Sequence, residues 1–311
     1  MYDIIGDIHG HASALTRLLT KLGYQETAGV WQHPQRRVIF LGDFVDRGPA
    51  QRETVRIART MVEAGHALTV MGNHEFNAVT WASPDPERPG SFLRPHSDKN
   101  RRQHQAFLDQ VGEGSAAHRE MIEWFKTLPL YLDLDGVRIV HACWHPAALR
   151  VLQAYTDDQH RIAPDAWPEL CRKGSPAYEA LETVLKGLEI PLPTGSDFHD
   201  KDGNPRRHIR TQWWNLEGLT YRDLAMVPAD VIPRIPHEPV AADVLPGYDG
   251  KKPLFIGHYW MSGDPTPLNP FIACVDYSIA AQHVGGAPGK LCAYRFDGEA
   301  ELAADKFVWV E

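Results

Sequence analysis

The stretch MYDIIGDIHGH (1–11) joins a short apolar run to a turn that contains Asp7, His9 and His11. An apolar run of this length that ends at a glycine is typical of a buried strand. A carboxylate and two imidazoles directly after such a strand are unfavourable in a hydrophobic core. We therefore expect this turn to lie at the edge of a sheet, where its side chains can bind a cation.

Four further segments repeat this pattern of an apolar run followed by a polar turn. They are RRVIFLGDFVDRGP (36–49), HALTVMGNHE (66–75), GVRIVHACWHP (136–146) and KKPLFIGHYW (251–260). Helical patterns at 12–23, 49–65 and 116–129 lie between several of these segments. The alternation predicts an α/β fold with a largely buried sheet. Because ligands of such sheets bind beyond the carboxyl ends of the strands, the polar turns should meet there.

The rest of the chain is less regular. Residues 87–105 are polar and contain prolines, which predicts a loop over the surface. Residues 156–250 are rich in proline and charge, and we interpret them as an inserted cap with one helix near 176–187. Strand patterns return at 271–280, 290–298 and 306–310. We therefore expect one domain over 1–311 that carries this cap.

Composition and charge exclude several classes of protein. The net charge is -8 and the pI about 6.0, so nonspecific binding of long nucleic acid, which needs a basic face, is not expected. The four cysteines are widely spaced and include no Cys-x-x-Cys pair, which argues against a zinc knuckle or a disulfide framework. The sequence shows no basic leader and no long apolar stretch. We expect no signal peptide, no membrane span and a cytoplasmic location.

The side chains of the five polar turns suit metal binding. They are Asp7, His9, Asp43, Asp46, Asn73, His74, His141 and His258. This set combines oxygen and imidazole ligands without thiolates, as borderline divalent metals such as Mn, Fe or Zn prefer. Two such ions would need a bridging carboxylate, would clamp a phosphoryl oxygen and would lower the pKa of a shared water. Each turn alone has an ordinary structural explanation, but five ligand-bearing turns at strand ends are hard to obtain by accident.

Five motifs give the chain a family resemblance. They are GDIHG (6–10), GDFVDRG (42–48), GNHE (72–75), LPLYLDLDGVRIVHACWHP (128–146) and GH (257–258). They resemble the motifs of the calcineurin-like metallophosphoesterases, and within them the phosphoprotein-phosphatase branch, which includes bacterial Ser/Thr phosphatases and symmetrical diadenosine tetraphosphatases. The first three motifs lie 36 residues (6 to 42) and 30 residues (42 to 72) apart, as that branch prefers. The resemblance is specific over 1–146 and 252–258 and weak over 156–250.

The resemblance implies a role for each motif residue. Asp7, His9 and Asp43 would hold a first metal ion, and Asp43, Asn73, His141 and His258 would hold a second, with Asp43 as the bridge. His74 would be the general acid that protonates the leaving oxygen, and Asp46 would orient it. Arg47 would bind the phosphate through its planar guanidinium. His11 is not among the ligands of the family, so it would either support them or begin the following helix.

The sequence departs from the family pattern in two places. The family usually has His-Ala-Gly where this chain has HAC (141–143), and the cysteine is expected to pack in the core, with a redox-sensitive thiol as the alternative. A second phosphate-binding arginine falls in the weakly matching region. Of Arg206, Arg207 and Arg210 we favour Arg210, because it directly precedes an apolar and aromatic stretch. A solvated basic patch is the alternative for these arginines.

The resemblance implies a sandwich of two sheets flanked by helices, and hydrolysis of a phosphate ester by direct attack of a metal-bridging hydroxide. We expect small phosphorylated substrates or nucleotides, because the long polar cap followed by Tyr259 and Trp260 favours a walled pocket. Tyr259 would bind the substrate there, with core packing as the alternative. A Ser/Thr or Tyr phosphoprotein phosphatase, which needs an open surface, is the second hypothesis. An inactive phosphate-binding scaffold is disfavoured, because metal binding alone would not require His74 and Asp46.

Overall fold

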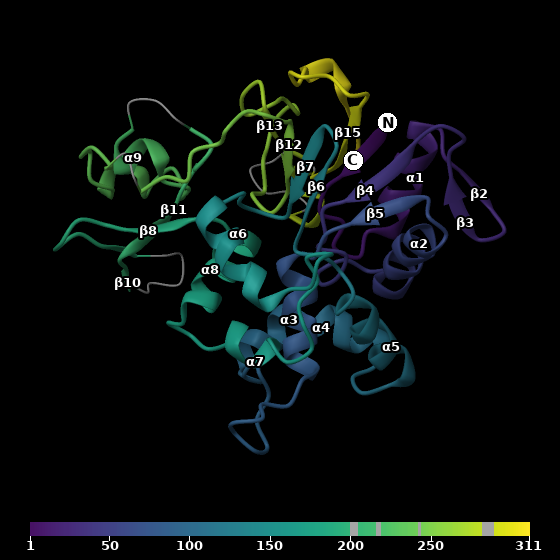
Figure 1. Ribbon diagram of the computed structural model, residues 1–311, viewed down its shortest axis with the longest axis horizontal. Coiled ribbons are helices and arrows are strands. Elements are labelled where there is room, and N and C mark those ends of the chain that lie inside the picture. The colour runs from purple at the N-terminus through teal and green to yellow at the C-terminus, as the bar shows by residue number, and fades with distance from the viewer. Residues whose placement is uncertain (200–204, 216–218, 242–243, 282–288) are drawn as a thin grey trace.

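The computed structural model describes residues 1–199, 205–215, 219–241, 244–281 and 289–311. Two β-sheets pack face to face, and helices lie on their outer sides (Figure 1). Within the described residues one of these sheets has six strands and the other has four. The α/β sandwich that the resemblance implied is therefore confirmed.

The six-stranded sheet contains three of the five predicted strands side by side. Its strands in spatial order are β14 (Asp276–Tyr277), β15 (Lys290–Phe296), β1 (Tyr2–Ile5), β4 (Arg37–Phe40) and β5 (Ala67–Thr69), and β16 (Phe307–Val310) pairs with β15. β1, β4 and β5 are parallel, whereas β15 is antiparallel to β1. Because parallel strands end at the same edge of a sheet, the turns that follow these three strands are neighbours.

The four-stranded sheet contains the other two predicted strands. Its spatial order is β13 (Ile272–Cys274), β12 (Leu254–Ile256), β7 (Val137–Val140) and β6 (Tyr131–Leu134). β7, β12 and β13 are parallel, and β6 is antiparallel to β7. All five predicted strands are thus confirmed. Between β13 and β14 the chain passes from one sheet to the other across a single residue, Val275.

The two cores follow the alternation of side chains along the strands. Ile4 and Phe255 point into the space between the sheets, where they belong to one buried cluster. Their chain neighbours Ile5 and Ile256 point outward and pack in the larger cluster that includes the helices. Both faces of each sheet are therefore covered, which explains why these strands read as continuous apolar runs.

The helices are α1 (Ala12–Leu22), α2 (Gln51–Glu63), α3 (Asn73–Ala82), α4 (Asp98–Val111), α5 (Ala116–Phe125), α6 (Pro146–Leu152), α7 (Trp167–Leu170), α8 (Pro176–Lys186) and α9 (Tyr221–Leu224). α1, α2, α5 and α8 coincide with the four predicted helices. α1 ends at Gly23, whose φ of 93° is left-handed and favours glycine. A hairpin of β2 (Gln25–Thr27) and β3 (Val30–Gln32) follows it. In the described ranges, no helix combines the length and the apolar character that crossing a membrane requires.

The prediction of a surface loop over 87–105 is wrong for its second half, where α4 begins. Ser97 caps this helix by accepting a hydrogen bond from the backbone N–H of Asn100. Four residues are buried along one face of the helix, with helical spacing: His104, Phe107, Leu108 and Val111. Three of these four residues lie beyond residue 105. The segment 87–105, which was chosen for its polar composition, therefore contained too few of the apolar positions to show the helical periodicity of α4.

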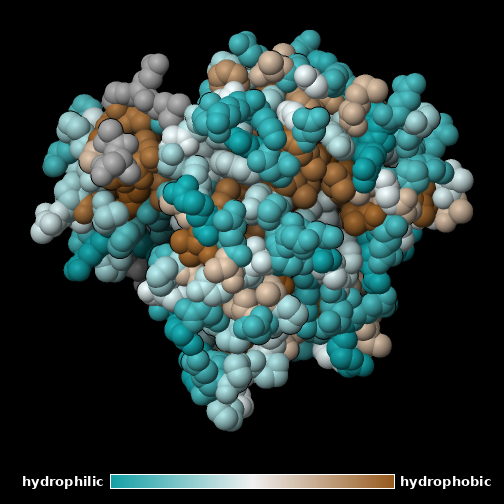
Figure 2. Space-filling model, in the orientation of Figure 1, coloured by the Kyte–Doolittle hydropathy of each residue, from teal (hydrophilic) through white to brown (hydrophobic). Residues whose placement is uncertain are grey.

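The predicted cap over 156–250 divides into two parts by its packing. α7 and α8 belong to the large core, through residues such as Leu170 and Leu181. From β8 (Glu189–Pro191) onward, the strands β9 (Phe198–His199), β10 (Pro205–Arg206) and β11 (His208–Arg210) and the helix α9 lie around a separate apolar cluster that includes Ile190 and Ile209. This second part, which we call the outer cap (188–245, as far as it is described), lies at the left of Figure 1. Brown surface gathers over it in Figure 2. The boundaries at 156 and 250, and the single domain, stay predictions.

The packing between the sheets generates a prediction for stability. Phe255 is fully buried, and its ring centroid lies 4.9 Å from that of Tyr294 on the opposite sheet. Phe255→Ala should lower the free energy of unfolding by about 3–5 kcal/mol, because it removes a buried ring and leaves a cavity. Chemical denaturation would measure this change. Val151→Ala, at a position that is 37% exposed on α6, is the control and should change stability by less than about 0.5 kcal/mol. Equal losses in the two variants would contradict this account of the core.

Candidate metal centre

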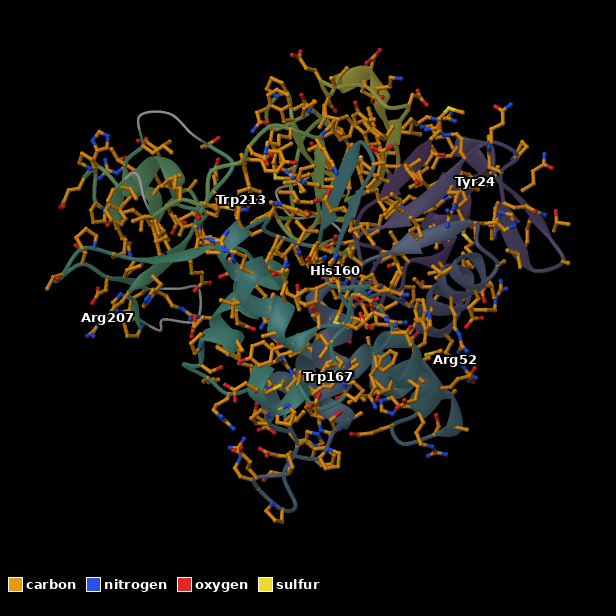
Figure 3. The ribbon with its side chains drawn as sticks, viewed as in Figure 1. Tyr24, Arg52, His160, Trp167, Arg207 and Trp213 are labelled. Atoms are coloured by element: carbon orange, nitrogen blue, oxygen red, sulfur yellow. The ribbon has the colours of Figure 1, made fainter. Side chains whose placement is uncertain are left out.

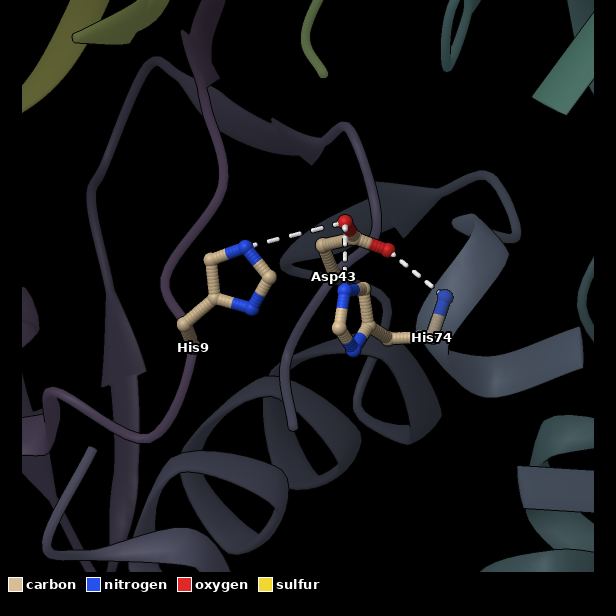
Figure 4. A group of neighbouring side chains, drawn as sticks. All are labelled: His9, Asp43 and His74. Carbon is tan, nitrogen blue, oxygen red and sulfur yellow. Dashed lines mark hydrogen bonds and ion pairs between the residues drawn. The ribbon is translucent and has the colours of Figure 1, made fainter. Parts of the chain in front are cut away.

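The predicted ligands meet at one edge of the sandwich. Asp7 and His9 follow β1, Asp43 follows β4, Asn73 begins α3, His141 follows β7 and His258 follows β12. Two sets of potential ligand atoms each lie within 4.8 Å of one another, one from His9, Asp43 and His74 and one from Asp43, His141 and His258. Figure 4 shows the first set. Asp43 belongs to both sets, as a bridging carboxylate would.

The carboxylate of Asp43 lies among three imidazoles. Its Oδ2 atom is 3.4 Å from Nε2 of His141, 3.7 Å from Nε2 of His9 and 3.9 Å from Nε2 of His74. Its Oδ1 atom accepts a 2.9 Å hydrogen bond from the backbone N–H of His74. Asp43 is only 2% exposed, and a buried carboxylate is unfavourable unless donors or cations surround it. The arrangement therefore depends on positive charge at this position.

Glu75 holds the turns of the centre together. It is fully buried, and its carboxylate accepts hydrogen bonds from the backbone N–H groups of Asp43, Phe44 and Gly72. Burial, followed by the nearby charge of Asp43, raises the pKa of Glu75 to about 7. No role for Glu75 was predicted from the sequence, although it is the last residue of the GNHE motif. Its role depends on a turn about 30 residues away, which local sequence does not reveal.

Motif glycines leave space for two of the carboxylates. A Cβ atom at Gly72 would lie 2.2 Å from Oδ1 of Asp43, and one at Gly257 would lie 2.3 Å from Oδ1 of Asp7. Both distances are shorter than any real contact of a Cβ atom. The glycines before Asn73 and His258 are therefore required by the close approach of these side chains.

Buried lone pairs at the centre fit bound metal ions. In the described part of the chain, Oδ1 of Asp7 and Nε2 of His9 have no hydrogen-bond partner. Nδ1 of His9 lies 2.9 Å from the carbonyl oxygen of Val45, which can only accept, so Nδ1 is protonated and Nε2 faces the site. Nδ1 of His141 donates in the same way to the carbonyl of Leu41. Metal-binding histidines are commonly oriented by such a bond, and this ligand set suits ions such as Mn, Fe or Zn.

Burial and mutual proximity shift the pKa values of these groups. Burial alone would lower the pKa of His141, but the carboxylate of Asp43 outweighs it and raises this pKa to about 10. Burial lowers the pKa of His9 to about 3. Burial raises the pKa of Asp7 well above its usual range, and Asp276 adds to this effect. Such perturbed groups, gathered at one sheet edge, are typical of a functional site.

His74 also contacts a second carboxylate. Nδ1 of His74 lies 2.5 Å from Oδ2 of Asp46, and Nδ1 of His104 lies 2.7 Å from Oδ1 of the same group. Burial alone would raise the pKa of Asp46, but the hydrogen bonds from the two imidazoles hold it well below its usual range. The pairing of His74 with Asp46 was predicted. His104 was missed, because it lies on α4 in a segment that we interpreted as a loop.

Arg47 lies beside the centre with its donors available. Its guanidinium lies over the ring of Trp260, 4.4 Å from the ring centroid. As far as the structure is described, Arg47 makes no hydrogen bond and no ion pair with other residues. Trp260 is 37% exposed and has a φ of 51°, so its backbone lies in the left-handed region, which is unusual for a bulky residue.

Arg210 reaches the centre from the outer cap. It lies on β11, with Nη1 3.2 Å from Nε2 of His258 and Nη2 3.4 Å from Oε1 of Glu189. Figure 3 places Arg207 at the outer end of the cap and Trp213 closer to the body of the molecule. Of Arg207 and Arg210, it is therefore Arg210 that lies beside a predicted ligand.

Tyr259 is buried, although it directly follows a predicted ligand. It is 6% exposed, and its hydroxyl accepts a 2.9 Å hydrogen bond from Nε1 of Trp213. Its ring meets that of Trp214 edge to face. Its role in substrate binding stays a prediction, while the neighbouring Trp260 is the aromatic residue that is exposed beside Arg47.

Two further sequence expectations concern the surroundings of the centre. His11 is the N-cap residue of α1, and its side chain makes no capping hydrogen bond. It therefore begins the helix, which was the second of its two predicted roles. Cys143 is fully buried, and burial raises the pKa of its thiol well above the usual range, as expected for a packed residue.

Comparisons with known proteins agree with these motifs. The family model of the calcineurin-like phosphoesterases matches residues 2–188. An asymmetrical bis(5'-nucleosyl)-tetraphosphatase PrpE of Oceanobacillus iheyensis is 30% identical over 141 residues, which are 45% of this chain and 54% of that protein. The PrpE of Bacillus velezensis is 30% identical over 196 residues, which are 60% of this chain and 76% of that protein. The chain thus spans about half the length of the first of these relatives.

A solved structure shows the same fold. It is a protein serine/threonine phosphatase from Saccharomyces cerevisiae with a TM-score of 0.51 and 16% identity, and the match covers 99% of this chain and 78% of that one. At this level of identity the likeness concerns the fold alone. The two PrpE relatives are named asymmetrical tetraphosphatases, and the branch that the motifs resemble includes bacterial Ser/Thr phosphatases and symmetrical diadenosine tetraphosphatases.

The central position of Asp43 generates a prediction for metal binding. Asp43→Asn should lose metal and activity together, because an amide shared by two sites supplies no negative charge. The fold should persist, since asparagine tolerates the φ of 50° at this position and keeps an oxygen for the bond from His74. Elemental analysis of the purified variant would count bound metal, with circular dichroism as the control for folding. Two equivalents of metal in a folded variant would contradict the bridging role.

Proposed function

The chain belongs to the calcineurin-like phosphoesterase family, and on this premise we propose that it hydrolyses phosphate esters or anhydrides with the help of two metal ions of the Mn, Fe or Zn type. One observation carries the proposal: the carboxylate of Asp43 is shared by two sets of ligand atoms, and His74 lies beside it. When bound, two such ions would lower the pKa of a shared water and polarise the phosphoryl oxygens. The phosphoryl group would then pass directly to water, without a phosphorylated residue.

The proposed ligands come from both sheets. Asp7, His9 and Asp43 would hold one ion, and Asp43, Asn73, His141 and His258 the other. The support for the first set is chemical, because Oδ1 of Asp7 and Nε2 of His9, both in the turn after β1, are buried and have no hydrogen-bond partner in the described residues. Nε2 of His141 lies 3.2 Å from the side-chain oxygen of Asn73, so these two proposed ligands face the same point.

His74 is the proposed general acid. Its Nδ1 is held by Asp46, so its Nε2 is left to face Asp43, at 3.9 Å from Oδ2. A proton on Nε2 would be transferred to the leaving oxygen as the bond to phosphorus breaks. Asp46 would fix the ring and stabilise its positive charge. The side chain of His74 is 12% exposed, so a substrate can reach it from the surface of the site.

Two arginines would bind the phosphate groups of the substrate. Arg47 has free donors and lies over Trp260, whereas Arg210 lies beside His258 on a strand of the outer cap. Guanidinium groups bind phosphates through paired hydrogen bonds. We propose that both arginines contact phosphate groups of the same substrate.

We propose small phosphorylated substrates, nucleotides among them, over phosphoproteins. Support comes from β11 of the outer cap, which brings Arg210 to 3.2 Å from the proposed ligand His258 and would wall one side of the centre. The PrpE relatives are named as nucleosyl tetraphosphatases, which agrees with a substrate that carries several phosphates. Trp260, which is exposed, and Tyr259, if it moves from its packed position, would contact the remainder of the substrate.

The general acid generates a prediction that also tests the function. The metal-loaded wild-type protein should hydrolyse both an aryl and an alkyl phosphate, and removal of the metals should abolish both activities. His74→Asn should retain its metals but slow the alkyl ester by about 10²–10⁴-fold, the usual contribution of a general acid. The loss should be much smaller for an activated phenol, which leaves without a proton. Steady-state kinetics on both esters would measure this, and an equal loss on both would rule out proton donation by His74.

Arg210 generates a prediction for the substrate class. Arg210→Ala should raise KM about 10–100-fold for nucleoside polyphosphates, because it removes charge-assisted hydrogen bonds worth about 1.5–3 kcal/mol. KM for a bare aryl phosphate should change less. Arg207→Ala is the matched control, at an exposed position of the same cap, and should leave both values unchanged. If phosphopeptides are turned over faster than every nucleotide, and Arg210→Ala affects all substrates alike, the phosphoprotein-phosphatase hypothesis replaces this one.

A further inference from the structure

Asp46 accepts hydrogen bonds from two buried imidazoles, although the proposed mechanism uses only one. Oδ2 accepts a hydrogen bond from Nδ1 of His74, and Oδ1 accepts one from Nδ1 of His104. An ionised carboxylate can only accept, so both ring nitrogens must carry a proton. The side chain of Asp46 is 3% exposed and that of His104 is 4% exposed. Neither oxygen therefore relies on water for its hydrogen bond.

The ring of His104 has no other polar contact in the described residues. Its Nε2 is buried without a hydrogen-bond partner. The ring stacks on Phe107 at 4.9 Å and lies 6.0 Å from the ring of Trp81. Aromatic packing therefore fixes the plane of the imidazole, and its one hydrogen bond is made to Asp46.

The helix that carries His104 also holds the turn that carries Asp46. Oε1 of Gln51 accepts from the backbone N–H of Asp46, and the backbone N–H of Gln51 donates to Oε1 of Gln110. Gln110 further donates to the carbonyl of Gly48. Since His104 and Gln110 both lie on α4, this one helix fixes the backbone of the turn and the carboxylate within it.

We propose that His104 is a positioning residue for the general acid. It keeps Oδ1 of Asp46 occupied, so that Oδ2 stays directed at His74 and the Nε2 of that ring stays directed at the reacting centre. The inference rests on the proposed function, and it adds a residue from outside the family motifs. The alternative is that His104 is only a buried core histidine, and this alternative predicts no effect on proton transfer.

The expected effect is selective. Without His104, Oδ1 of Asp46 loses its partner, and the carboxylate can rotate away from His74. His104→Phe, which keeps an aromatic ring, should lower kcat for an alkyl phosphate about 10-fold, a fraction of the 10²–10⁴-fold worth of the acid itself. The kcat for an activated aryl phosphate, KM and the metal content should change less than about 2-fold. His104→Asn places an amide N–H near the former Nδ1 and should restore most of the loss.

His118 offers a matched control. It is as buried as His104, its Nε2 also lacks a partner in the described structure, and its ring lies 5.6 Å from that of Phe107. Among the described residues, no contact joins His118 to Asp46. The Nδ1 atom of His118 accepts a hydrogen bond only from the backbone N–H of Gly114. His118→Phe should therefore leave the ratio of alkyl to aryl hydrolysis unchanged. An equal change of this ratio in the His104 and His118 variants would overturn the proposal.

A measurement without turnover separates this inference from the proposed function. In protein with labelled histidine, the downfield Nδ1 proton of His74 reports its hydrogen bond to Asp46. The proton should shift or disappear in His104→Phe and remain in His104→Asn and His118→Phe. An unchanged resonance in His104→Phe, or a loss of rate that is equal for both esters, would show that His104 is merely structural. If the wild-type protein hydrolyses neither ester with metals bound, the proposed function fails, and the resonance alone decides the role of His104.

Discussion

The structure depends on one unfavourable group, the buried carboxylate of Asp43. A carboxylate that is 2% exposed needs compensating charge, and the chain surrounds it with imidazoles that come from three turns. Two neighbouring residues allow the carboxylate to occupy this position. Glu75 ties the backbone of two of the turns together, and Gly72 leaves space where any side chain would collide. Parallel strands of both sheets end at this point, so the turns that surround Asp43 come from both halves of the sandwich.

The meeting of the motif residues could be predicted from sequence because each predicted ligand lies within a few residues of the end of a strand. The spacing of the motifs and the pattern of the strands therefore predict the same residues at the edge of the sheets. The parts that could not be predicted depend on contacts between distant segments. His104 meets Asp46 across 58 residues, from a helix whose apolar face begins only where the polar segment ends. Tyr259 and Trp260 are adjacent in the sequence, but Tyr259 packs against Trp213 and Trp214, whereas Trp260 has a left-handed backbone and is exposed.

The boundary between the two parts of the predicted cap coincides with the end of the family match. The family match ends at residue 188, and the outer cap begins with β8 at Glu189. The outer cap has its own apolar cluster, so its residues stabilise one another largely without the main core. Its strand β11 nevertheless brings Arg210 against His258, a predicted ligand that also lies beyond the family match. The proposed site therefore combines residues from within the family match with residues that lie beyond it.

The passage of the chain between the sheets at Val275 has a mechanical consequence. β13 and β14 are continuous through this one residue but belong to opposite sheets, so sliding one sheet over the other would strain a covalent link. Gly6 lies against the link, since a Cβ atom there would be 2.1 Å from the carbonyl oxygen of Val275. Resistance to such shear would keep the predicted ligands that follow β1 and β4 in register with those that follow β7 and β12. If the predicted ligands hold two ions, the alignment of the two sheets would govern the distance between them.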